Sequence, residues 1–123
     1  PGGGVEHGED PIDTVIRELA EETGLVGRPR QLLGLDSRVI PASERLRPGP
    51  EHHNVGVFYE VEVVPTLQLT TADPEIVDAR WIAGDQVAQM RRSSLVDIGL
   101  NLNRLRPAEG HVASIPIGGL LEH

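Results

Sequence analysis

The sequence predicts an α+β fold, because helix and strand patterns are mixed along the chain without regular alternation. A strong helical pattern covers residues 11–23, and two segments with strand character follow it at residues 30–40 and 54–64. A shorter strand is expected at residues 78–82 and a second helix at residues 84–92. This order favours α+β over a doubly wound parallel sheet, which would need repeated strand–helix–strand units.

The first helix is defined by signals at both of its ends. Asp10 is expected to be the N-cap, Pro11 suits the first turn, and Gly24 suits the C-terminal stop. The residues that recur at helical spacing and form one apolar face are Ile12, Val15, Ile16, Leu19 and Thr23. The second helix is expected to be capped by Asp85.

The main strand is expected at residues 54–64, where apolar and polar residues alternate. The residues predicted to share one face are Val55, Val57, Tyr59, Val61 and Val63, with Glu60 and Glu62 on the other face. Pro65 is expected to end this strand, and residues 67–71 to return as its partner. The preceding strand is expected to bend at Gly34, and the three prolines of residues 41–53 indicate a long surface loop.

The length of 123 residues, with 38% hydrophobic residues, fits one domain with a modest packed core. We expect residues 1–120 to form this single domain. Residues 121–123 resemble the start of a histidine tag. Because the chain opens at Pro1, directly in a glycine loop, we also expect that N-terminal strands precede it in the native protein.

The net charge of −8 argues against a surface for nucleic-acid polymers or anionic membranes, since basic residues do not cluster strongly. The chain has no cysteine, which excludes disulfides, a thiolate nucleophile and a zinc–thiolate site and suits the cytoplasm. No apolar run reaches the length of a membrane span. We therefore expect a cytoplasmic protein without a membrane or nucleic-acid partner.

Three glutamates, Glu18, Glu21 and Glu22, lie on one turn of the first helix. At about 100° per residue, Glu18 and Glu22 are separated by about 40° around the helix, and Glu21 lies about 60° from Glu18. Two unit charges about 5.5 Å apart repel by about 3 kcal/mol at an effective dielectric constant of about 20. Arg17 is the only basic residue of this helix. The cluster is either a solvated charged face or a site for a divalent cation.

Two features favour the cation site. Solvated helix faces normally interleave Lys or Arg at four-residue spacing, which this helix does not do. Mg2+ prefers oxygen ligands and often binds phosphate at the same time. The glycines that precede the helix let the backbone approach such a ligand closely; they are Gly2, Gly3, Gly4 and Gly8.

The loop and helix together resemble the Nudix box, from Gly3 to Leu25. Gly3 is followed after five residues by Glu9, and after seven more by REL, one residue, EE, one residue and GL. The resemblance implies the Nudix fold, a mixed β-sheet sandwiched between α-helices. It also implies a Nudix pyrophosphohydrolase that uses Mg2+, with Mn2+ as a substitute, to cleave the pyrophosphate bond of a nucleoside diphosphate linked to another group. The implied partner is a nucleotide-type small molecule, and a homodimer is compatible with the family.

The resemblance further implies the roles of individual residues. The expected catalytic residues are the three glutamates of the turn, and the expected metal ligands are Gly2 through its carbonyl oxygen, Glu18, Glu21, Glu22 and Glu75. Asp73 and Asp78 are rivals to Glu75 as the acidic ligand from a later loop. Glu9 and Arg17 are expected to form an ion pair that orients the helix. The general base is Glu18 or a loop carboxylate.

Contacts with substrate are less well defined by the sequence. His53 and Arg38 are the candidates for binding a substrate phosphate, and His52 is an alternative. The competing interpretation is that these are ordinary loop side chains. Trp81 is expected to be a core or sheet-packing residue.

ADP-ribose is one candidate substrate. Pro41 lies sixteen residues after Leu25, close to the position of a marker proline in ADP-ribose-cleaving members of the family. The alternative to an enzyme is a Nudix-fold module that senses a nucleotide without turnover, and the intact set of glutamates favours the enzyme. A third interpretation, an acidic domain with a charged helix, predicts that millimolar Mg2+ does not change the melting temperature.

Overall fold

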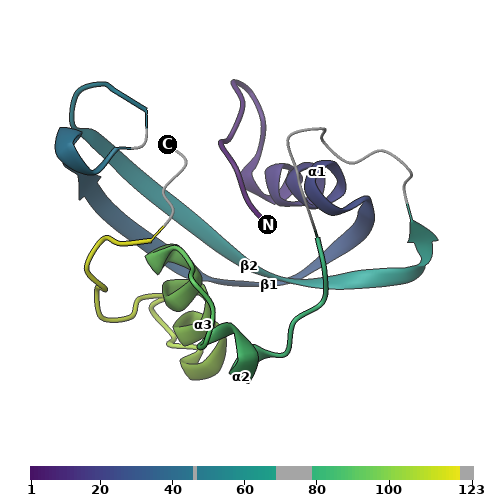
Figure 1. The fold of residues 1–123 in the computed structure, drawn as a ribbon. Coiled ribbons are helices and arrows are strands. Elements are labelled where there is room, and N and C mark those ends of the chain that lie inside the picture. Colours follow the sequence, from purple (N-terminus) through teal and green to yellow (C-terminus); the bar gives the residue numbers. More distant parts are fainter. Residues whose placement is uncertain (46, 69–78, 120–123) are drawn as a thin grey trace. The chain divides into compact units, whose positions relative to one another are not determined.

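The computed structural model describes residues 1–45, 47–68 and 79–119 (Figure 1). Its elements in chain order are α1 (Pro11–Thr23), β1 (Leu25–Ile40), the 3-10 turn η1 (Ala42–Glu44), β2 (His52–Gln68), α2 (Gly84–Val87) and α3 (Ser94–Leu105). In the described part of the chain, β1 and β2 form one two-stranded sheet. Helices and a sheet of this kind confirm the predicted α+β class.

Two compact units divide the chain, and each contains part of both strands. The first unit consists of Pro1–Leu32 and Tyr59–Trp81, and the second of Leu33–Phe58 and Ile82–His123. α1 therefore belongs to the first unit and α3 to the second. The predicted tag remnant at residues 121–123 lies outside the described residues.

α1 begins and ends at the residues that the sequence predicts. The Asp10 side chain accepts a hydrogen bond from the Ile12 N–H at 3.0 Å, and proline occupies the first turn. Gly24 ends the helix in the left-handed conformation, with φ of 70°, and its N–H donates to the Ala20 carbonyl. These local signals place the glutamates of α1 at fixed positions on its surface.

In the first unit, α1 packs closely against the sheet through Leu19. A Cβ atom built on Gly27 of β1 would overlap the side chains of Leu19 and Val61. The absence of a side chain at Gly27 thus lets the helix approach the strands. Val61 belongs to the face of β2 that the alternation predicts to be buried.

The two strands are antiparallel, as their cross-strand side-chain pairs show. Arg30 of β1 forms an ion pair with Glu62 of β2 at 2.9 Å, and Ser37 of β1 lies 2.8 Å from the ring of His53. The later residue of β1 therefore pairs with the earlier residue of β2, which is the order of an antiparallel pair. The sheet expected from the family resemblance is mixed, and the described residues form this antiparallel pair.

Three expectations about β2 need correction. The strand does not end at Pro65 but continues to Gln68, and residues 67 and 68 extend it instead of returning as a partner. Proline is tolerated because both strands of a two-stranded sheet are edges, where a missing N–H need not break a ladder. The buried face is also not uniform, because Val55 is 58% exposed and Phe58 packs on the core of the second unit. Residues 69–71 lie outside the described residues.

The segment after β2 also differs from the prediction. Residues 79–82 form neither helix nor strand, and residue 78 lies outside the described residues. The helix predicted at residues 84–92 is reduced to α2, and its N-cap is Ala83, not Asp85. Where α2 ends, Nη1 of Arg92 donates to the carbonyl oxygens of residues 87, 88 and 90 and so satisfies acceptors that have no partner within a helix.

α3 is the main element that the sequence interpretation did not include. Ser93 caps it, accepting from the Leu95 N–H at 3.2 Å, and Arg106 ends it with φ of 44°. Its buried residues form the core of the second unit with residues of β1 and the C-terminal segment: Leu33, Ile98, Leu102 and Val112. A capping serine, apolar residues four apart and a following Pro107 were the available signals.

Among the described residues, no helix combines the length and apolarity that a membrane crossing requires.

Candidate functional site

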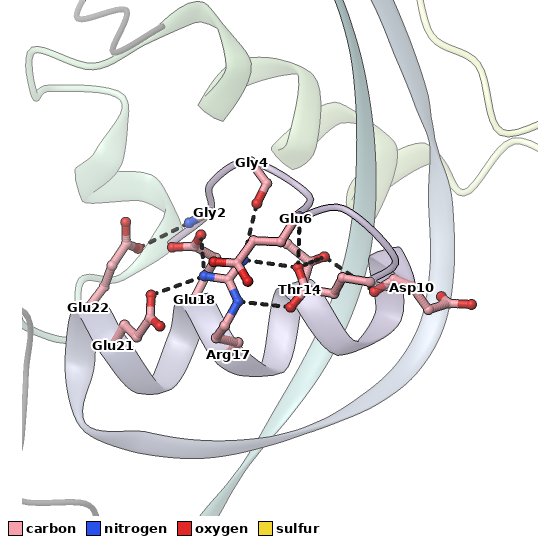
Figure 2. Close-up of polar contacts among 10 residues, drawn as sticks. Gly2, Gly4, Glu6, Asp10, Thr14, Arg17, Glu18, Glu21 and Glu22 are labelled. Carbon is pink, nitrogen blue, oxygen red and sulfur yellow. Dashed lines mark hydrogen bonds and ion pairs between the residues drawn. The ribbon is translucent and has the colours of Figure 1, made fainter.

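The candidate site is formed by the loop of residues 1–10 and by α1 of the first unit (Figure 2). The loop turns at Gly8, which has φ of 81°, and the Glu9 N–H donates to the Glu6 carbonyl at 3.0 Å. At the start of the loop, Gly2 lies beside α1, and its N–H donates to Glu22 Oε2 at 3.0 Å. The glycine-rich loop thus lies beside the carboxylates of the helix.

Arg17 is at the centre of the polar contacts in Figure 2. Its Nε and Nη2 atoms donate to the two carboxylate oxygens of Glu9, at 2.8 and 3.0 Å. Its Nη1 atom donates to Glu18 Oε1 at 2.9 Å and to Glu21 Oε2 at 3.1 Å. Nη2 also donates to the Gly4 carbonyl at 3.1 Å. One guanidinium therefore joins three carboxylates and the loop backbone.

Glu9 is held in its charged form by these contacts. The hydrogen bond from Arg17, followed by that from Thr14 Oγ1 at 2.6 Å, lowers the pKa of Glu9 from 4.5 to about 2. The hydrogen bond with Glu9 raises the pKa of Arg17 further above its ordinary value. Thr14 is a partner that the sequence interpretation missed, although a threonine one turn after the N-cap was a signal for it.

The Glu9 contribution to stability is expected to be lost on acidification. The folded pKa of about 2 lies below the unfolded value of 4.5, so the contribution is fully present above pH 4.5 and declines as the pH falls towards 2. In metal-free buffer, the stability difference between the wild type and Glu9→Gln should shrink over this interval. Urea unfolding at a series of pH values measures it. A difference that stays constant down to pH 2 would contradict the prediction.

The three predicted catalytic glutamates differ in their surroundings, since Glu18 and Glu21 contact Arg17 and Glu22 contacts the loop. The Glu18 side chain is 14% exposed, and its carboxylate lies where a Cβ atom of residue 3 would be, so Gly3 leaves room for it. The Glu21 side chain is 49% exposed. Glu22 contacts the loop through the N–H of Gly2.

The donor atoms of this site fit a hard divalent cation, because carboxylate and carbonyl oxygens are the ligands that Mg2+ prefers. In the structure these carboxylates accept hydrogen bonds from protein groups: Arg17 donates to Glu18 and Glu21, and the Gly2 N–H donates to Glu22. Across the described residues, no three acidic or histidine side chains lie in positions to share a metal ion. The metal ligands, including the Gly2 carbonyl, remain predictions.

Other predicted site residues lie elsewhere or outside the described part of the chain. Glu75 and its rivals Asp73 and Asp78 fall in residues 69–78, which the structure does not describe. Trp81 is 79% exposed, so the expectation that it packs in the core or on the sheet is wrong. It follows β2 without belonging to a strand, which leaves its indole in solvent.

The two candidates for phosphate binding belong to the second unit. His53 is exposed on β2, and its Nε2 lies 2.8 Å from Ser37 Oγ. Arg38 is buried: its Nε donates to Asp36 Oδ2 at 2.6 Å and its Nη1 to Ser94 Oγ at 2.8 Å. Asp36 and Arg38 share a face of β1 because they are two residues apart. The predicted substrate contacts of His53 and Arg38 stay predictions.

The comparison with known families gives the class of the protein. The family model of the NUDIX domain matches residues 1–97, which contain the complete loop and helix described above. This match covers more than half of the chain, and the chain belongs to the Nudix family.

The chain is also similar in sequence to a particular curated protein. The chain is 36% identical over 64 residues to the ADP-ribose pyrophosphatase of Methanocaldococcus jannaschii. The alignment covers 52% of this chain and 34% of the relative, so the chain spans about a third of that relative's length. No solved structure gives a significant match to the chain.

Proposed function

We propose that this protein is a Mg2+-dependent Nudix pyrophosphohydrolase that cleaves the pyrophosphate bond of a nucleoside diphosphate linked to another group. The observation that carries the proposal is the arrangement of the glycine loop beside α1, where Arg17 contacts Glu18 and Glu21 and the Gly2 N–H contacts Glu22. A charged helix face without a function would not need the loop glycines to lie against these carboxylates.

Each part of the site has a role in this proposal. Glu18, Glu21 and Glu22 would hold the metal ion, and the Glu9–Arg17 pair would keep α1 in register with the loop. When bound, Mg2+ would neutralise the charge of the pyrophosphate and assist the attack of water on phosphorus. A carboxylate must accept the proton of that water, and Glu18 is our candidate because its side chain is the less exposed of the two that contact Arg17.

ADP-ribose is the first substrate to test. The M. jannaschii relative is an ADP-ribose pyrophosphatase, and Pro41 lies close to the position of a marker proline in ADP-ribose-cleaving members of the family. Cleavage of the pyrophosphate bond by water would release AMP and ribose 5-phosphate from this substrate.

A substrate panel with product identification tests the proposal. It would contain ADP-ribose, nucleotide sugars, dinucleoside polyphosphates and oxidised nucleoside triphosphates, each assayed with millimolar Mg2+ and with EDTA. We expect turnover of at least one compound with Mg2+ and loss of turnover with EDTA. Metal-independent binding of a nucleotide without turnover across the panel would instead favour a nucleotide-sensing module.

A further inference from the structure

The Arg17 guanidinium presents two chemically distinct sides to its partners. Nε and Nη2 form a two-bond fork with Glu9, whose oxygens lie 2.8 and 3.0 Å away. Nη1 alone bridges Glu18 Oε1 and Glu21 Oε2, at 2.9 and 3.1 Å. The contacts with Glu9 and those with the two helix carboxylates therefore use different nitrogen atoms.

The side of Arg17 that binds Glu9 is firmly held. Glu9 also accepts hydrogen bonds from Thr14 Oγ1 at 2.6 Å and from the Glu6 N–H at 3.2 Å. The Gly4 carbonyl accepts a further bond from Nη2. These contacts fix the guanidinium independently of Nη1, which can lose its two partners without releasing Arg17 from the site.

We propose that Arg17 is a built-in counter-cation that bridges Glu18 and Glu21 in the metal-free protein, and that a divalent ion displaces Nη1 from these carboxylates. Nε and Nη2 remain on Glu9 during this exchange. The inference rests on the proposed function, because it takes Glu18 and Glu21 to be metal ligands. Arg17 then has two roles: its ion pair with Glu9 orients α1, and its contacts with Glu18 and Glu21 set the affinity for the metal.

The exchange follows from charge and position. A metal ion shared by Glu18 and Glu21 would compete with Nη1 for Glu18 Oε1 and Glu21 Oε2, because two cations in contact with the same carboxylates repel each other. The carboxylates accordingly surround an N–H donor in the described structure and do not form a group arranged for a metal. Arg17 lowers the repulsion among the carboxylates without metal, and it lowers the metal affinity by the same interaction.

Titration calorimetry with Mn2+ alone tests the proposal. Arg17→Gln is expected to bind Mn2+ about tenfold more tightly than the wild type, a change of about 1.4 kcal/mol. Arg30→Gln is the matched control, since it removes the same charge from an exposed ion pair with Glu62 in the same unit, and we expect a change within about twofold. The Arg17 effect should persist in 1 M NaCl, where the Debye length is about 3 Å, because a direct contact is poorly screened.

The outcomes separate this inference from the proposed function. Equal or weaker Mn2+ binding by a folded Arg17→Gln overturns the role of Arg17, while binding by both proteins keeps the metal site. If neither protein binds Mn2+, the metal site itself is overturned and the inference falls with it.

A measurement on the wild type does not depend on the folding of a variant. In 15N NMR of the arginine side chains, saturating Mg2+ should shift the Nη1 signal of Arg17 and leave its Nε signal nearly unchanged. Unchanged Nη1 and Nε signals at saturating Mg2+ would overturn the exchange.

Discussion

Glu22→Gln is expected to reduce kcat for the proposed hydrolysis by about 10²- to 10³-fold, the usual effect of removing one group that stabilises transition-state charge. Glutamine keeps the size of the side chain and an oxygen that can accept from the Gly2 N–H, which lies 3.0 Å from the carboxylate in the wild type. The loop should therefore stay on the helix while the negative charge needed by the metal is lost. Steady-state kinetics on the substrate identified in the panel measures the change.

The control for Glu22→Gln is Glu109→Gln, which removes the same charge from an exposed position between α3 and the C-terminal segment. We expect its kcat to stay within about twofold of the wild type, as for surface substitutions away from a site. Circular dichroism and melting temperature would establish that both variants are folded. Undiminished turnover by Glu22→Gln would refute the catalytic role of this glutamate.

Arg38→Met is expected to destabilise the protein by about 3–5 kcal/mol, the cost of breaking a buried ion pair by removing one partner. The side chains of Arg38 and Asp36 are only 7% and 10% exposed, and their atoms are 2.6 Å apart. Methionine would leave the Asp36 carboxylate without its cation and Ser94 without the Nη1 donor. Urea unfolding at neutral pH measures the loss.

The double variant Asp36→Leu/Arg38→Met is the matched control for this prediction. Replacing both members of a buried pair by apolar residues is often close to neutral, so the double variant should recover most of the lost stability. The same proteins test the predicted contact between Arg38 and substrate phosphate. An Arg38→Met protein of unchanged stability with a raised KM would contradict the structural role and support phosphate binding.

The first unit shows how far local sequence signals reach. Asp10, Pro11 and Gly24 predict both ends of α1 because capping depends on neighbouring residues and on backbone conformation. The box residues predict the family, which the domain match confirms. The close approach of the loop to the helix is not local, since Gly2 and Glu22 are twenty residues apart in the sequence.

The second unit shows where such signals end. Arg38 is a candidate phosphate ligand from the sequence, but its guanidinium contacts Ser94, which lies 56 residues further along the chain. The face of β2 that packs on the core there includes Phe58, although the alternation of valines predicts the opposite face. A period of two identifies the two faces of a strand, and the packing partner decides which of them is buried.

The sequence by itself determined the class of the protein, the bounds of α1 and the positions of its three glutamates, because capping and helical spacing act within a few residues. Only the tertiary structure decided that Arg17, besides its predicted pair with Glu9, also contacts Glu18 and Glu21, and that Arg38 is buried against Asp36. The reason is physical: a charged side chain takes its partners from all groups within reach in space, and those groups depend on how the whole chain is folded.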